Sequence, residues 1–156
     1  MSVASDVSVA GARTAAGLRK GRSGYQARMA NPFGHVDVRV TSMEDAQPFY
    51  DVLLSELDFT GEPPGGDWLV WDAKGELPSA AYFAITEDPD HTPNANRIAF
   101  WAADRETVDR VASLMRSVGA TITSGPKEYP EYSDMYYAVY FDDPCGNKLE
   151  VVFRTV

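Results

Sequence analysis

The chain has 156 residues, 44% of them hydrophobic, which suits one domain or two small modules that share a core. It carries 14 basic and 23 acidic residues, and this acidic balance argues against nucleic acid as a partner, because acidic surfaces repel phosphate. No apolar run approaches the roughly 18–20 residues of a membrane helix, and no secretory signal is recognisable. Cys145 is the single cysteine, which excludes a disulfide within the chain, so we expect a cytoplasmic protein.

The charge is unevenly distributed along the chain. Residues 1–30 carry five basic side chains against one acidic residue, whereas the remainder carries nine basic and 22 acidic ones. Ala, Ser, Gly and Arg dominate the N-terminal stretch, which has little hydrophobic periodicity. We therefore expect residues 1–32 to form a flexible basic extension and residues 33–156 to form a single domain.

The first predicted strand lies at 35–40, where polar and apolar residues alternate. Thr41 or Ser42 can cap a helix that we expect to run to about Leu57, with Pro48 as an irregularity inside it. The other elements expected in this half are a turn at 61–66, a strand at 68–71, a turn at 74–75 and a strand at 80–86.

The same order recurs in the second half. Residues 97–102 predict a strand, and Asp104 is a good N-cap for a helix from about 105 to 118, which Gly119 ends. Further strands are expected at 120–124, 136–141 and 148–154, with turns at 125–126 and 142–147.

This repetition predicts the architecture. Each half gives approximately strand, helix, strand, strand, strand, and an internal repeat of this size is strong evidence for tandem modules. We expect an α+β fold in which tandem βαβββ modules form a cupped mixed sheet. Module one would span about 33–88, a linker 89–96, and module two about 97–156.

The order of elements resembles the vicinal-oxygen-chelate superfamily of glyoxalases, bleomycin-resistance proteins and extradiol dioxygenases. Three stretches carry the resemblance: Gly34 to Val40 followed by Ala46 to Tyr50, Arg97 to Phe100, and the closing hairpin Tyr137 to Val151 with its DPCGNKLE sequence. The hairpin is the most specific of the three, because aspartate, proline and glycine suit its turn.

The resemblance implies a metal site at four strand positions, of which this chain matches two. His35 and Glu150 match ligand positions on the first and last strands, and such a pair suits Zn, Fe, Mn or Ni. Arg97 occupies a third position, where a guanidinium stays protonated and cannot ligate a metal. Glu150 is therefore either a metal ligand or the ion-pair partner of Arg97, and His35 is either a ligand or a hydrogen-bonded core histidine.

Strand alternation adds residues to the expected cup. Asp37 and Arg39 share a face with His35, and Trp101 shares one with Arg97. The candidate substrate-binding residues are Arg97, Trp101, Asp37, Arg39, Tyr132 and Tyr137, and Arg97 could clamp an anionic or polar group. The acidic, aromatic segment 128–132 is interpreted either as a lid or as a plain surface loop.

Two functions follow from the resemblance. The first is a glyoxalase-like or dioxygenase-like enzyme, a lyase, isomerase or dioxygenase, that acts on a small oxygenated molecule with Glu150 and His35 as catalytic residues. The alternative is a metal-free small-molecule binding protein of the bleomycin-resistance type. Either would have a small-molecule ligand, no nucleic-acid or membrane partner, and a homodimeric state that the family commonly adopts.

Overall fold

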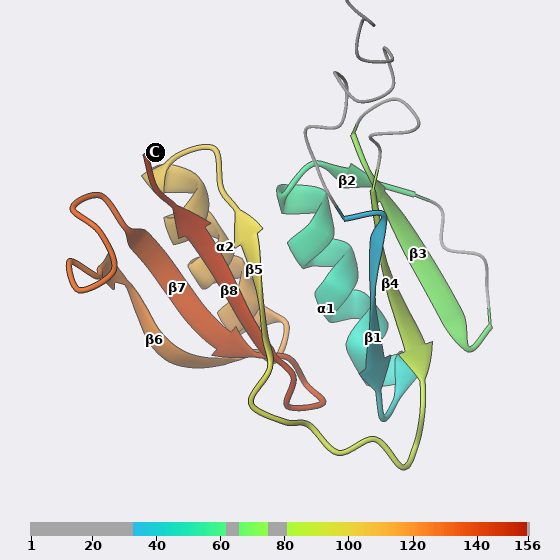
Figure 1. Ribbon diagram of the computed structural model, residues 1–156. Coiled ribbons are helices and arrows are strands. Elements are labelled where there is room, and N and C mark those ends of the chain that lie inside the picture. The colour runs from blue at the N-terminus through green and yellow to red at the C-terminus, as the bar shows by residue number, and fades with distance from the viewer. Residues whose placement is uncertain (1–32, 62–65, 75–80, 156) are drawn as a thin grey trace, which may run out of the picture.

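The computed structural model describes residues 33–61, 66–74 and 81–155, and these residues form two modules with the same order of elements (Figure 1). The first module consists of β1 (His35–Val40), α1 (Met43–Glu56), β2 (Phe59–Thr60), β3 (Trp68–Ala73) and β4 (Tyr82–Glu87). The second consists of β5 (Arg97–Trp101), α2 (Arg105–Ser117), β6 (Thr121–Glu128), β7 (Tyr137–Asp142) and β8 (Lys148–Phe153). The predicted α+β fold of tandem βαβββ modules is confirmed.

Both helices begin at the residues that capping rules favour. The Ser42 hydroxyl accepts a hydrogen bond from the Asp45 backbone N–H at 3.2 Å, and the Asp104 carboxylate accepts one from Thr107 N–H at 2.7 Å. Pro48 lies inside α1, one turn beyond the place where a proline costs least. The helix keeps its length because its buried stripe packs into the core.

The prediction of a turn at Gly125-Pro126 is wrong, because both residues lie within β6. The pairing of β6 with β7 shifts register between Ser124 and Lys127, so the chain bulges there and continues as a strand. Gly125 has a φ of 80°, and a Cβ at this position would lie 2.3 Å from the Ala138 carbonyl oxygen. The glycine therefore allows a close backbone approach within the sheet.

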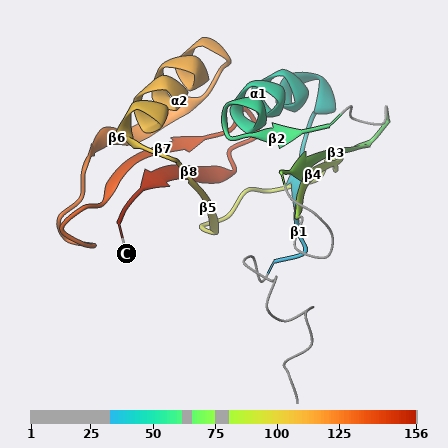
Figure 2. The ribbon, with the colours of Figure 1, turned by 90° about the horizontal axis from the view of Figure 1, so that it is seen from above.

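Each module contributes a four-stranded mixed sheet. The strand orders are β1-β4-β3-β2 and β5-β8-β7-β6, with β1 parallel to β4 and β5 parallel to β8. Figure 2 shows the two helices side by side on one side of the sheets, and no helix among the described residues covers the opposite face of either sheet. We call these uncovered surfaces the open faces of the first and second sheets.

One hydrophobic core spans both modules. It combines the helix-facing side chains of β1 and β4 with those of β5, β7 and β8 and with the buried stripes of α1 and α2. Phe83 of β4 and Phe100 of β5 contact each other across the two modules, with ring centroids 5.4 Å apart. The two halves therefore bury their apolar surfaces against one another.

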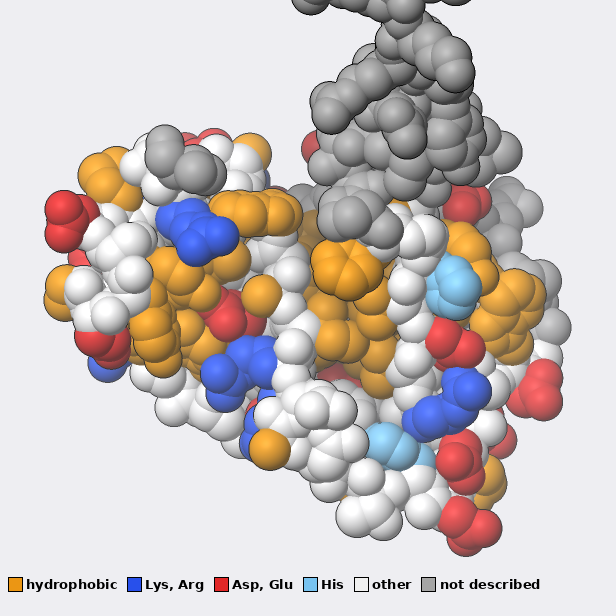
Figure 3. Space-filling view, in the orientation of Figure 1, with side chains coloured by type: hydrophobic (Ala, Val, Ile, Leu, Met, Phe, Trp, Pro, Cys, Tyr) orange, Lys and Arg blue, Asp and Glu red, His pale blue; other side chains and the backbone are white. Residues whose placement is uncertain are grey.

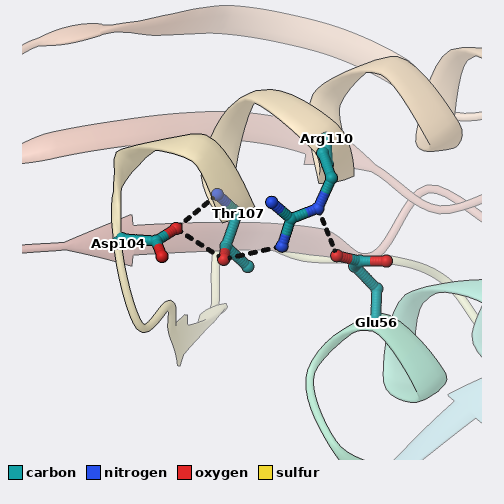
Figure 4. A network of polar contacts seen from close by, with 4 residues as sticks. All are labelled: Glu56, Asp104, Thr107 and Arg110. Atoms are coloured by element: carbon teal, nitrogen blue, oxygen red, sulfur yellow. Dashed lines mark hydrogen bonds and ion pairs between the residues drawn. The ribbon is translucent and has the colours of Figure 1, made fainter.

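Two polar contacts between the modules accompany this core. The buried Tyr50 hydroxyl of α1 donates to Asp143 in the turn between β7 and β8 at 2.8 Å. At the C-terminal end of α1, Arg110 of α2 donates to Glu56 at 2.8 Å and, within α2, to the Thr107 hydroxyl at 3.0 Å, as Figure 4 shows. The Glu56–Arg110 pair is partly exposed, so the Tyr50 contact is the stronger constraint.

Some sequence predictions fall outside the described residues. These are the flexible extension at 1–32, most of the turn at 61–66, the glycine of the turn at 74–75, and the start of the strand at 80–86. Within the part of the chain that the structure describes, no helix has the length and apolar character needed to cross a membrane.

Replacing Tyr50 with Phe is expected to lower the free energy of unfolding by about 1–3 kcal/mol, because the buried Asp143 carboxylate loses a hydrogen-bond donor. Chemical denaturation measures this change. Tyr137→Phe is the matched control, since the Tyr137 hydroxyl donates to the exposed Asp109 at a similar 2.8 Å. Equal losses in both variants would contradict the role given to the buried contact.

Candidate functional site

The open face of the second sheet is polar and aromatic. Alternate residues of β8 separate the two sides of the sheet, with Leu149 and Val151 in the main core and Glu150 and Val152 on the open face. The other residues packed together on this face are Tyr129, Tyr136, Ala138 and Tyr140. The period-two alternation thus places side chains of β7 and β8 on this face, and the tyrosines from the loop before β7 pack against them.

Glu150 lies at the centre of this face and is only 5% exposed. Its carboxylate accepts a short hydrogen bond from the Tyr136 hydroxyl. Tyr140 lies opposite Glu150 in the antiparallel pairing of β7 and β8, so the two side chains are neighbours on the same face. A buried carboxylate needs such donors, and tyrosine supplies one here in place of the expected arginine.

Burial and the nearby Glu150 carboxylate keep the hydroxyls of Tyr136 and Tyr140 protonated. Burial, the hydrogen bond to Glu150 and the Glu150 charge raise the pKa of Tyr136 to about 12. Burial and the Glu150 charge also raise the pKa of Tyr140 well above the usual value for tyrosine. Both hydroxyls therefore keep their protons near neutral pH and remain able to donate hydrogen bonds.

Arg97 is on this face but does not pair with Glu150. No ion pair joins the two residues, although both belong to the described part of the chain, and the Arg97 guanidinium lies 4.7 Å from the centre of the Tyr140 ring. Glu150 and Arg97 therefore do not form the ion pair that was one of the two predictions for Glu150. Tyr140 lies next to both charged groups, opposite Glu150 in the sheet and beneath the Arg97 guanidinium.

A cavity of about 520 Å³ lies between the facing edge strands β1 and β5. Its wall is mostly apolar and combines helix-facing residues of both sheets with the ends of α1 and β2. Figure 3 shows this region as an apolar hollow between the two sheets, with basic side chains lying on both sides of an acidic one over β5 and β8. Its lining residues include His35, Tyr82, Ala99, Phe100 and Trp101.

His35 lines this cavity from the first sheet. Its ring stacks on Tyr82 with centroids 4.6 Å apart, and its ring nitrogens form no hydrogen bond with any described residue. Asp37 and Arg39, on the same open face, form an ion pair at 2.8 Å, and Asp37 also accepts from the Thr86 hydroxyl at 2.9 Å. These two charged groups thus satisfy each other.

The residues predicted for one shared cup are distributed over two surfaces. His35 and Trp101 line the cavity, whereas Arg97 and Glu150 lie on the adjoining open face of the second sheet and are not among its lining residues. The two surfaces meet along β5, because Ala99 lines the cavity and pairs in register with Glu150. Adjacent strands are about 4.8 Å apart, so Glu150 is one strand away from the cavity wall.

The predicted tyrosines occupy different places. Tyr137 lies on the helix-facing side of β7, where its hydroxyl donates to Asp109, so it is separated from Glu150 by the sheet. Tyr132 is 61% exposed and stacks on Tyr129, whose hydroxyl donates to Ser124 at 2.7 Å. Tyr129 thus anchors the loop that follows β6, and the role of the segment 128–132 as a lid remains a prediction.

The described side chains of one chain do not fit a divalent metal. No group of three or more His, Cys, Asp or Glu side chains within residues 33–61, 66–74 and 81–155 could hold an ion. The Glu150 carboxylate accepts from Tyr136, and the nearby Arg97 is a permanent cation. His35 and Glu150 therefore do not form a metal site by themselves.

Tyr136 and Tyr140 belong to the strand predicted at 136–141, and their contacts with Glu150 were not among the predictions. A signal for Tyr140 was available, because the turn at 143–147 places Asp142 opposite Lys148 and hence Tyr140 opposite Glu150. Tyr136 precedes β7, and its approach to Glu150 depends on the course of the loop.

Comparison with known proteins agrees with this fold. The model of the Glyoxalase/Bleomycin resistance protein/Dioxygenase superfamily matches residues 32–151, whereas no curated protein matches the chain. Among solved structures, a glyoxalase/bleomycin resistance protein from Albidiferax ferrireducens T118 is 26% identical, with a TM-score of 0.64, over 80% of this chain and 100% of its own.

Two further structures show similar coverage. A protein from Bacillus halodurans is 25% identical, with a TM-score of 0.64, over 80% of this chain and 96% of its own. A glyoxalase/bleomycin resistance protein/dioxygenase family enzyme from Burkholderia phytofirmans PsJN is 14% identical, with a TM-score of 0.60, over 76% of this chain and 95% of its own, and it supports the fold alone. The family model matches most of the length of this chain, and the chain therefore belongs to the Glyoxalase/Bleomycin resistance protein/Dioxygenase superfamily.

Proposed function

We propose that this chain binds a small oxygenated organic molecule in the cavity between its modules and on the adjoining open face of the second sheet. The observation that carries the proposal is the cavity of about 520 Å³, whose size is typical of small-molecule sites. Its apolar wall suits the hydrocarbon part of a ligand. Polar groups of the ligand would face Tyr136, Glu150 and Arg97 across β5.

The metal-free form of this function is favoured over the metal-dependent one by the chemistry of the available side chains. Glu150 is engaged by Tyr136, and Tyr140, its neighbour on this face, carries the Arg97 guanidinium over its ring. A ligand would therefore be held by hydrogen bonds, ring contacts and charge. This corresponds to a binding protein of the bleomycin-resistance type.

A second candidate is an enzyme of the same superfamily in which His35 acts as a general base. It is favoured by the position of His35, whose ring nitrogens form no hydrogen bond with the described residues and whose side chain lines the cavity. A base so placed could accept a proton from a bound molecule. Glu150, one strand beyond the cavity wall, would orient the polar end of the substrate through Tyr136.

We also propose that the chain forms a homodimer and is located in the cytoplasm. Trp68 and Trp101, on the first and second sheets respectively, are 44% and 59% exposed. Aromatic side chains on open sheet faces are typical of surfaces that a second subunit covers. The cytoplasmic location remains a prediction from the single cysteine and the sequence pattern.

Replacing Ala99 with Phe is expected to weaken binding of the neutral probe 2-naphthamide by about tenfold or more, because the larger side chain fills the cavity. Tryptophan fluorescence or NMR titration measures the affinity. Ala103→Phe is the matched control, since Ala103 follows β5 but does not line this cavity. Unchanged binding in the Ala99 variant would contradict the proposed site.

Protein purified without chelators is expected to contain far less than stoichiometric Zn, Fe, Mn or Ni, because the described side chains supply no ligand cluster. Elemental analysis of the purified chain measures the content, with His35→Ala and Glu150→Ala analysed beside it. A stoichiometric metal that disappears in both variants would refute the metal-free proposal and favour the metal-dependent enzyme.

A further inference from the structure

The basic side chains of the folded part divide into two groups. The described residues contain nine Lys and Arg side chains, and five of them pair with a carboxylate. A sixth, Arg116, donates to the Ala112 carbonyl oxygen at 3.2 Å. The remaining three, Arg97, Lys127 and Arg154, form no ion pair with any residue in the described part of the chain.

All three of these cations lie on the open face of the second sheet, and each lies over an aromatic ring. The distances to the ring centres are 4.7 Å for Arg97 over Tyr140, 5.0 Å for Lys127 over Tyr129 and 5.0 Å for Arg154 over Trp101. The cations are thus supported by the π-faces of the rings, while their N–H groups stay available to a ligand.

The clustering is unusual for this protein because of its charge. Residues 31–156 carry 22 acidic side chains against nine basic ones, so carboxylate partners are abundant. The carboxylate at the centre of the face, Glu150, accepts from Tyr136 and leaves the three cations unpaired. The face is therefore a local site of positive charge on an acidic protein, which attracts small anions.

Trp101 connects this positive face to the cavity. Its ring lies beneath the Arg154 guanidinium, and its side chain also lines the cavity wall. Arg97 lies at the start of the same strand, with Ala99 between the two positions. A flat ring placed in the cavity could therefore extend an acidic substituent towards a guanidinium, which binds carboxylates with a planar fork of donors.

We propose that the ligand of this site is an aromatic organic anion, whose ring lies in the cavity beside Trp101 and whose carboxylate is bound by Arg154 and Arg97. This inference rests on the proposed function, and it adds the charge and chemical class of the ligand. Neutral molecules of the same shape would bind more weakly, and cationic ones would be repelled by the unpaired guanidinium groups.

The test compares three probes that share one ring system: 2-naphthoate, neutral 2-naphthamide and cationic 2-naphthylmethylammonium. Titration of the full chain at low ionic strength is expected to give an affinity for naphthoate about tenfold or more above that for naphthamide, and the weakest binding for the ammonium. In the double variant R97Q/R154Q, naphthoate is expected to lose most of its advantage over naphthamide, because both positive charges that select the carboxylate are removed.

Arg116→Gln is the control for a charge lost away from the site, since it removes one positive charge from α2, where Arg116 donates to a backbone carbonyl. It is expected to keep the preference for naphthoate, and thermal melting checks that every variant is folded. Equal binding of naphthoate and naphthamide in the natural chain would overturn the inference and leave the proposed cavity intact. Failure of all three probes to bind would overturn both.

Discussion

The buried hydrogen bond from Tyr50 to Asp143 is the contact on which the arrangement of the two modules depends. It joins the helix of the first module to the closing turn of the second, and both residues are almost fully buried. Asp143 also accepts from the backbone N–H groups of Cys145 and Asn147, and the Asn147 amide donates to the Arg39 carbonyl oxygen on β1. The turn between β7 and β8 therefore holds β1 next to the second module by hydrogen bonds, and this position of β1 creates the cavity between β1 and β5.

The site combines two surfaces with different chemistry. The cavity is apolar because it opens between two edge strands onto residues of the shared core, whereas the adjoining face is polar because its strands turn their other side chains outward. On that face the tyrosines separate opposite charges, with Tyr136 donating to Glu150 and Tyr140 supporting Arg97. The guanidinium is thus left available for an external anion.

Much of the fold could be predicted because its signals are local. Period-two alternation identified β1, and the caps Ser42 and Asp104 marked the starts of both helices. The predicted turn at Gly125-Pro126 is wrong, because these two residues, whose types favour turns, form a bulge inside β6. It also did not include β2, whose two residues are too few to show a period.

The sequence by itself determined the order of elements in both modules and which residues of β1, β5 and β8 share a face, because backbone geometry sets the side-chain period within a strand. Only the tertiary structure decided which residues meet across strands and modules. Glu150 is satisfied by Tyr136 and not by Arg97, and His35 lines a cavity that Glu150 does not reach. Those contacts depend on loop paths and on the packing of two sheets around one core, which no local periodicity encodes.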